Sequence, residues 1–220
     1  MKHLFISMYL ALFSLSVCAQ GKEAKIKIFT DKGKVTVKLY NETPQHRDNF
    51  IKLVKDGYYE NVLFHRVIKL FMTQAGEKAA PKDTTVVNPK NETLDYTIPA
   101  EILYPQLFHK RGQLCAARKS DEVNPTRASS GVQFYIVTGK HYTDSELDKM
   151  QQERNIVFTP EQREAYKIQG GSPHLDNAYT IFGEVTKGMK VIEKIELVET
   201  SENNRPVKDV HIKKMKLLKK

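Results

Sequence analysis

One arginine and one glutamine, about a third of the way along the chain, have the types and the spacing of a small binding or catalytic site. Arg66 and Gln74 are eight residues apart. Because side chains alternate along a strand, this even spacing lets both face the same side of two strands joined by a short connection. Phe71 and Met72 would line the space between them. The chemistry would be that of an oriented cation over an apolar pocket, which is unusual because burial of an unpaired charge is unfavourable.

The same segment allows a simpler interpretation, an apolar strand from which Arg66 extends to solvent. Other residue types that carry chemistry give no competing pattern. The seven histidines are scattered without ligand spacing, so we expect no metal ion and no cofactor. We interpret His65 as a structural residue and Cys115 as a small buried core residue.

Residues 1–19 have the pattern of a secretory signal peptide. A basic start precedes an apolar stretch at 4–17, and small residues precede the expected cleavage after Ala19. The stretch is shorter than the roughly 20 residues of a transmembrane helix. Cys18 allows a second interpretation, because the four residues that end there form a loose lipobox whose cysteine would carry a lipid. We predict an exported, periplasmic protein, with lipoprotein anchoring at Cys18 as the less favoured alternative.

The chain is basic, with a formal net charge of +9. Loss of residues 1–19, which hold one lysine and no acidic residue, leaves +8. This charge favours acidic or anionic partners, but no basic motif interleaved with aromatic residues points to nucleic acid. Residues 20–220 suit one domain with a substantial core. We expect a monomer, and Cys115 alone cannot form an internal disulfide.

Short alternating runs predict a mainly β domain. Residues 25–29 and 34–40 alternate between polar and apolar, and Gly33 supplies the turn of a hairpin. Thr43, followed by proline, predicts a helix N-cap, and Gly57 predicts the end of that helix. Further strands are expected at 62–68, 71–74, 96–98, 113–117, 133–137, 181–185 and 210–218, the last with a bulge at Lys213-Lys214, and a short helix at 191–197. Many short strands with two core helices favour a closed antiparallel barrel.

Residues 141–171 interrupt the β pattern. Thr143 and Glu146 form one capping box, and Thr159 and Gln162 form another, each at the start of a polar helix. A pair of glycines ends the second helix. We predict a helical hairpin inserted between two strands, which is either a solvated addition or an element that tunes binding.

Four segments carry a family resemblance. Residues 64–76 closely resemble the signature of cyclophilin-type peptidyl-prolyl cis-trans isomerases, and residues 112–118, 130–136 and 175–185 resemble three further blocks of that family in the right order. The similarity runs from about residue 26 to residue 218. It implies a closed eight-stranded antiparallel barrel capped by two helices. It also implies isomerisation of Xaa-Pro bonds, with proline-containing peptides and unfolded or folding exported proteins as partners.

The resemblance also implies roles for individual residues. Arg66 takes the place of the catalytic arginine, and Gln74 that of a glutamine that holds the arginine or the substrate backbone. The positions matched to substrate binding are Phe71, Met72, Ala117, Arg118, Gln133, Tyr135, His174, Leu175 and Tyr179. Among these, Ala117 and Arg118 match the strand that binds the peptide through its backbone.

Four positions depart from the best-known family pattern and reshape the rim of the expected pocket. Tyr135 stands where phenylalanine is usual, Tyr179 where histidine is common, and His174 where tryptophan is frequent. Arg118 replaces a frequent asparagine. Arg66 stays in place, which favours an enzyme over the alternative of an exported binding module that holds proline-containing segments.

Overall fold

The predicted hairpin opens the fold. β1 (Lys25–Thr30) pairs with β2 (Gly33–Leu39), and Ile28 lies opposite Val35. The structure is a computed structural model that describes residues 23–77 and 94–219. The predicted signal peptide and Cys18 lie outside the described residues.

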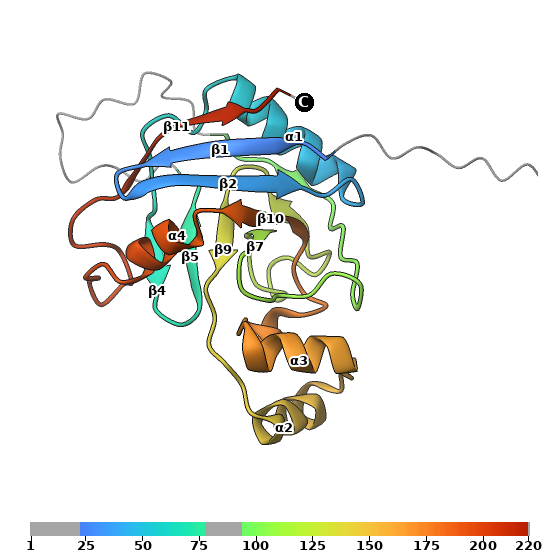
Figure 1. Cartoon of the computed structure of the whole chain (residues 1–220). Helices are drawn as coiled ribbons and strands as arrows, with labels where there is room; N and C mark the ends of the chain where they lie inside the picture. Colours follow the sequence, from blue (N-terminus) through green and yellow to red (C-terminus); the bar gives the residue numbers. More distant parts are fainter. Residues whose placement is uncertain (1–22, 78–93, 220) are drawn as a thin grey trace, which may run out of the picture.

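A curled antiparallel sheet carries most of the fold (Figure 1). In the described residues, its nine strands lie in the order β3-β11-β1-β2-β10-β7-β9-β5-β4, and β6 pairs with β8 separately. The bounds are β3 Val62–Leu63, β4 Arg66–Ile68, β5 Met72–Ala75, β6 Thr97–Ile98, β7 Gln113–Ala116, β8 Ser129–Ser130, β9 Phe134–Val137, β10 Ile181–Lys187 and β11 His211–Leu217. The mainly β prediction is confirmed.

Among the described residues the sheet is a curled half-barrel of nine named strands, so the closure of the barrel and the count of eight strands are not confirmed as predicted. The strand predicted at 62–68 is divided by Phe64 and His65 into β3 and β4, which lie at opposite edges of the sheet. The Phe64 amide donates to the Val210 carbonyl at 2.9 Å, and the Val67 amide donates to the Asn204 carbonyl at 2.8 Å. These two hydrogen bonds hold residues 64–67 against residues 204–210, which precede β11, where the chain passes from one edge of the sheet to the other.

The predicted bulge in β11 is confirmed. Phe29 pairs with Lys214 and the next residue, Thr30, pairs with Ile212, so Lys213 is the extra residue. A bulge bends a strand and increases its twist, which helps a sheet to curl.

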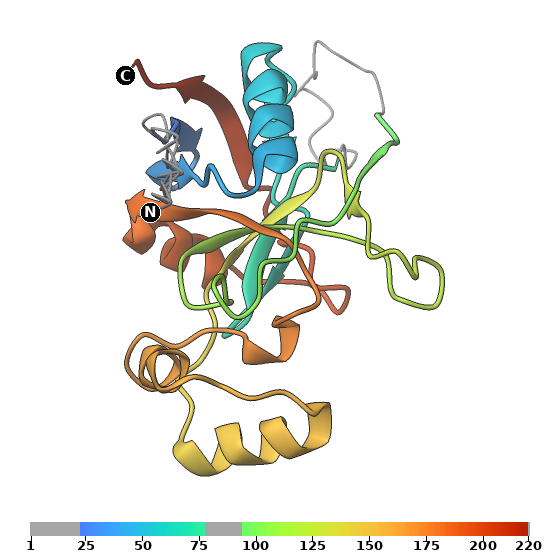
Figure 2. The ribbon, with the colours of Figure 1, turned by 90° about the vertical axis from the view of Figure 1, so that its right-hand side faces the viewer.

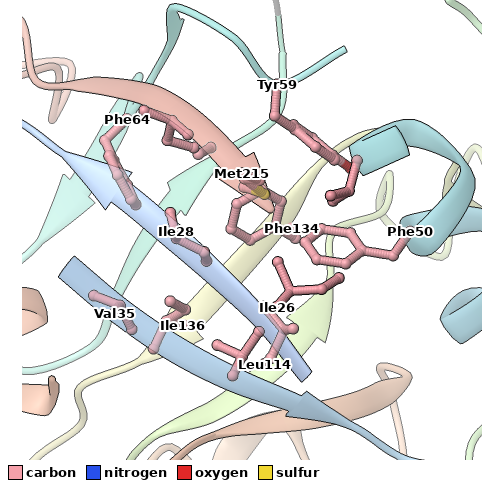
Figure 3. Close-up of a cluster of buried hydrophobic side chains, with 14 of the residues drawn as sticks. Ile26, Ile28, Val35, Phe50, Tyr59, Phe64, Leu114, Phe134, Ile136 and Met215 are labelled. Carbon is pink, nitrogen blue, oxygen red and sulfur yellow. The ribbon is translucent and has the colours of Figure 1, made fainter. Parts of the chain in front are cut away.

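The main core lies between the sheet and α1 (Pro44–Lys55), as Figure 3 shows for part of it. Phe50 of α1 packs against Phe134 and Phe182, with ring centroids 5.4 Å apart in each pair. Leu53 and Val54 are also buried, so these residues form the apolar face of α1. A further helix, α4 (Met189–Glu196), buries Ile192 and Ile195 in the same core.

The N-terminus of α1 is capped differently from the prediction. Thr43 occupies the N-cap position, but its side chain makes no capping hydrogen bond. Glu101 supplies the cap instead: its carboxylate accepts from the backbone amides of Gln45 at 3.1 Å and His46 at 3.0 Å. A carboxylate at a helix N-terminus satisfies free amides and interacts favourably with the helix dipole.

The predicted helical hairpin is formed by α2 (Asp144–Arg154) and α3 (Pro160–Ile168), and both capping boxes are present. Figures 1 and 2 show the two helices at the end of the molecule opposite α1. They enclose a small apolar cluster of their own, made of Phe108, Leu147, Phe158, Ala165 and Tyr166. Within the described residues, no helix has the length and apolar character needed to cross a membrane.

Candidate active site

The strand register confirms that Arg66 and Gln74 face each other. The two residues are paired directly across β4 and β5. A tight turn joins the strands, in which the Phe71 amide donates to the Ile68 carbonyl at 3.2 Å and Leu70 has a left-handed φ of 58°. Directly opposed residues project from the same face of a strand pair, so both side chains point to one site.

A chain of amide side chains orients Arg66. Its Nη1 donates to Oε1 of Gln74 at 3.4 Å, and Nε2 of Gln74 donates to Oε1 of Gln133 at 2.9 Å. Within the described part of the chain, no carboxylate forms an ion pair with Arg66. Among the described residues, the guanidinium is therefore held by a neutral amide, and no carboxylate is paired with its positive charge.

These side chains line a cavity of about 530 Å³. Ten of the eleven predicted site residues line it: Arg66, Phe71, Met72, Gln74, Ala117, Arg118, Gln133, Tyr135, Leu175 and Tyr179. They come from β4, from β5 and β9 and the residue just before each of these two strands, from the chain after β7, and from the region of the short 3₁₀ helix η1 (Pro173–Leu175). The fold thus brings together segments that are far apart in the sequence.

The apolar wall of the cavity is continuous with the protein interior. Met72 and Tyr135 are only 2% and 4% exposed, and they belong to a buried cluster that also contains Cys115. Phe71 and Leu175 are partly exposed and pack against this cluster. Close-packed interiors resist deformation, so the wall is a firm surface for an apolar ring.

Ala117 and Arg118 differ in how their backbone groups are used. The Ala117 amide donates to the Gln133 carbonyl at 3.0 Å, and its carbonyl accepts from the Ser130 amide at 2.8 Å. Among residues 23–77 and 94–219, no hydrogen-bond partner is seen for the backbone amide or carbonyl of Arg118. Arg118 can therefore offer both backbone groups to an extended peptide, whereas each backbone group of Ala117 already makes one hydrogen bond within the fold.

The Arg118 side chain fixes the rim of the cavity. Its Nε donates to the Ala178 carbonyl at 2.8 Å, and its guanidinium lies 4.4 Å from the centre of the Tyr179 ring. It also forms an ion pair with Asp121. This charge is thus neutralised and stacked, in contrast to that of Arg66.

His174 is the predicted site residue that does not line the cavity. Its ring packs against Phe71, with centroids 5.0 Å apart. Burial lowers the pKa of His174 to about 4. At neutral pH it is therefore an uncharged ring that supports the pocket wall from the side.

Eight residues that line the cavity were not predicted from the sequence. Asp95, Tyr96, Thr97, Lys119, Val123, Asn124, Ala128 and Ser130 extend it beyond the predicted residues. Ser130 lies in one of the quoted family blocks, so that block could have pointed to it. Residues 119–128, between β7 and β8, carry no motif, and only the fold brings part of this loop to the cavity. In the part of the chain that the structure describes, no cluster of three metal-ligating side chains is present.

The geometry and the sequence lead to the same family. Residues 25–217 match the family described as "Cyclophilin type peptidyl-prolyl cis-trans isomerase/CLD". The chain belongs to this family. It is a peptidyl-prolyl cis-trans isomerase, and the resemblance carried by residues 64–76 is confirmed.

Bacterial relatives of this cyclophilin-type isomerase match over almost their whole length. A protein of Staphylococcus epidermidis, provisionally assigned as a peptidyl-prolyl cis-trans isomerase, is 32% identical over 197 residues, which cover 88% of this chain and 91% of the relative. A protein of Staphylococcus haemolyticus with the same provisional assignment is 30% identical over 194 residues, covering 88% and 90%.

Solved structures support the cyclophilin fold. The cyclophilin-type isomerase of Cryptosporidium parvum has a TM-score of 0.64 at 23% identity, covering 90% of this chain and 99% of that one. A second structure of that protein, obtained in the presence of the dipeptide Ala-Pro, has a TM-score of 0.63 at 23% identity and covers 89% and 99%.

Proposed function

We propose that this cyclophilin-type isomerase accelerates rotation about Xaa-Pro bonds in exported proteins and that Arg66 stabilises the twisted amide. One observation carries the proposal: the guanidinium of Arg66 is oriented by Gln74, has no carboxylate partner in the described residues, and lines one cavity with an apolar wall. An uncompensated cation beside an apolar surface suits a reacting group that is part apolar ring and part amide.

The reaction explains why such a site is sufficient. A peptide bond resists rotation by about 18–20 kcal/mol because the nitrogen lone pair is shared with the carbonyl. At the halfway twist this sharing is lost and the lone pair is localised on nitrogen. A donor aimed at that nitrogen binds the twisted state better than either planar state, which lowers the barrier. An acceleration of about 10⁵-fold requires only about 7 kcal/mol.

The two parts of the site have separate tasks in this mechanism. Phe71, Met72, Tyr135 and Leu175 hold the proline ring while the preceding carbonyl turns. Arg66 then donates to the localised lone pair, and exclusion of water from the wall strengthens its electrostatic effect. Gln74 keeps the guanidinium in the orientation that the twisted amide needs. No covalent intermediate or proton transfer is needed.

Substrate binding follows from the backbone of Arg118 and from the apolar wall. In the described residues the backbone amide and carbonyl of Arg118 have no hydrogen-bond partner, so they can pair with an extended peptide next to the proline pocket. The presence of Ala-Pro in one structure of the Cryptosporidium parvum protein supports a short proline-containing peptide as the ligand. Unfolded or folding polypeptides present such segments.

The exported location rests on the signal-peptide pattern of residues 1–19. Intact-mass measurement of the protein isolated from its own cell tests it. A mature chain that begins at Gln20 supports export with cleavage after Ala19, and a mass that includes lipid on Cys18 supports the lipoprotein alternative. A chain that retains Met1 would contradict both.

The catalytic role is tested with Arg66→Ala in an exchange-spectroscopy assay on a short Xaa-Pro peptide. We expect kcat/KM to fall at least tenfold while the far-UV circular dichroism spectrum is unchanged. Arg47→Ala is the matched control, because Arg47 lies on α1 and pairs with Asp48 away from the cavity. A wild-type rate in Arg66→Ala would refute the assignment.

A further inference from the structure

A buried chain of hydrogen bonds runs from the apolar wall of the cavity to the helical hairpin. The Tyr135 hydroxyl lies 3.1 Å from Nε2 of His109, and Nδ1 of His109 lies 2.9 Å from Oδ1 of Asp176. The other carboxylate oxygen, Oδ2, accepts from the Tyr166 hydroxyl at 2.6 Å. Tyr135 lines the cavity, whereas Tyr166 belongs to α3.

All four side chains are removed from solvent. His109 and Asp176 are each 1% exposed, and Tyr166 is fully buried. An isolated carboxylate at such a position would be strongly unfavourable. Asp176 avoids this penalty because it also accepts from the His109 backbone amide at 2.8 Å. Its two oxygens thus accept three hydrogen bonds, and loss of any donor leaves buried polar groups unsatisfied.

The donors and acceptors of this hydrogen-bond network are consistent with one another. Burial raises the pKa of Tyr135 and of Tyr166 well above the usual phenol value, so both remain neutral donors at physiological pH. When Nδ1 of His109 donates to Asp176, its Nε2 is the acceptor that the Tyr135 hydroxyl needs. Each donor of the network then has one acceptor, which restrains the position of the Tyr135 hydroxyl.

The base of the hairpin is joined to the same network through the backbone. The Ser172 amide donates to the His109 carbonyl at 2.8 Å, and Gly171 exchanges backbone hydrogen bonds with Lys140 at 2.9 and 3.2 Å. A Cβ atom at Gly171 would lie 2.4 Å from the His109 carbonyl oxygen, which shows how close the two segments are. A shift of α3 therefore changes the surroundings of His109 directly.

We propose that His109, Asp176 and Tyr166 are positioning residues for Tyr135, and that the hairpin at 143–168 thereby sets the affinity of the pocket for the proline ring. The proposal rests on the proposed function, because it takes the Tyr135 wall as the proline-binding surface. It makes the hairpin a determinant of substrate binding, although α2 and α3 contribute no residue to the cavity lining.

A double-mutant cycle tests the coupling. Tyr135→Phe and Tyr166→Phe each remove one hydroxyl, at opposite ends of the hydrogen-bond network. We expect each single variant to raise KM for a short Xaa-Pro peptide at least threefold with kcat nearly unchanged. The KM of the double variant should be no higher than that of the single variant with the higher KM. Effects that multiply, or a Tyr166→Phe enzyme with the wild-type KM, would overturn the proposal.

Tyr142→Phe is the matched control. The Tyr142 ring packs against Tyr166 on the same hairpin, with centroids 6.3 Å apart, but its hydroxyl is not part of the chain. We expect this variant to keep the wild-type KM. A rise equal to that of Tyr166→Phe would show a general effect of hairpin packing and would also overturn the proposal.

A spectroscopic readout is independent of turnover. The proton on Nδ1 of His109 should give a downfield imidazole resonance in the wild-type enzyme that is shifted in both Tyr135→Phe and Tyr166→Phe and retained unshifted in Arg66→Ala. An unshifted resonance in Tyr166→Phe would overturn the network. Because Arg66→Ala tests the catalytic assignment and leaves this network intact, failure of one proposal is distinguishable from failure of the other.

Discussion

Arg66 lies directly opposite Gln74 in the β4–β5 pair, and Nη1 of the guanidinium is 3.4 Å from Oε1 of the amide. The pairing places a neutral acceptor, not a carboxylate, next to the cation. A carboxylate would orient the guanidinium equally well, but it would also cancel the positive charge that the twisted amide needs.

Gln74→Glu tests this choice of acceptor. The substitution keeps the shape of the side chain and places a charged oxygen where the amide oxygen now lies. We expect kcat/KM for an Xaa-Pro peptide to fall at least tenfold at pH 7, because the new ion pair reduces the field of Arg66. Exchange spectroscopy provides the rate. Gln152→Glu, on the exposed surface of α2, should leave it unchanged, and a wild-type rate in Gln74→Glu would contradict this explanation.

Glu101 is expected to stabilise α1 without affecting catalysis. Glu101→Ala removes the acceptor for the amides of Gln45 and His46 at the helix N-terminus. Loss of a cap of this kind lowers the free energy of unfolding by about 1–2 kcal/mol. Urea unfolding measures the change. Glu153→Ala, which breaks an exposed pair with Lys149, should have an effect below about 0.5 kcal/mol.

The rate per folded molecule of Glu101→Ala should match that of the wild type, because Glu101 does not line the cavity. Equal stability of the Glu101→Ala and Glu153→Ala variants would show that Glu101 is not the effective cap.

The lowered pKa of His174 should make the free energy of unfolding depend on pH. Burial lowers its pKa from the usual 6.5 to about 4 in the folded state. Between these values the unfolded chain binds a proton that the folded chain does not, so the free energy of unfolding falls as the pH decreases from 6.5 to 4. His174→Phe removes this contribution. The free energy of unfolding of the wild type and of His174→Phe is measured by denaturant unfolding at each pH. The difference between the two proteins should change steadily from pH 6.5 to 4, and a constant difference over this range would contradict the prediction.

Local patterns predicted much of the fold because their physical causes are local. The bulge at Lys213, the capping box of Thr159 and the facing of Arg66 and Gln74 depend only on neighbouring residues and strand periodicity. The same holds for the buried face of α1, where Phe50 recurs at helical spacing with other apolar residues.

The features that sequence reasoning missed depend on contacts between distant segments. Glu101 caps α1 from 56 residues away, and a local pattern could only point to Thr43. The link between Tyr135 and His109 joins residues 26 apart on different elements. The division of 62–68 into two strands follows from the need to connect the two edges of the sheet, which no property of that segment alone reveals.

Gly76 should be required for both stability and catalysis. It has a φ of 107°, and a Cβ atom there would lie 2.1 Å from the Val132 carbonyl oxygen, next to Gln133. Gly112→Ala is a matched control, because Gly112 also has a positive φ of 87° but a Cβ atom there meets nothing closer than 3.8 Å. We expect Gly112→Ala to lower the free energy of unfolding by about 1 kcal/mol through backbone strain alone.

Gly76→Ala should cost about 2 kcal/mol more than the control, because the backbone of Val132 must also move. That movement displaces Gln133, whose Oε1 accepts from Gln74 at 2.9 Å, so the orientation of Arg66 is lost as well. We therefore expect kcat/KM to fall several-fold in Gly76→Ala and to stay unchanged in Gly112→Ala, as measured by peptide isomerisation under conditions where both variants are folded. Equal stability and equal rates in the two variants would show that the close approach of Gly76 to Val132 does not support the site.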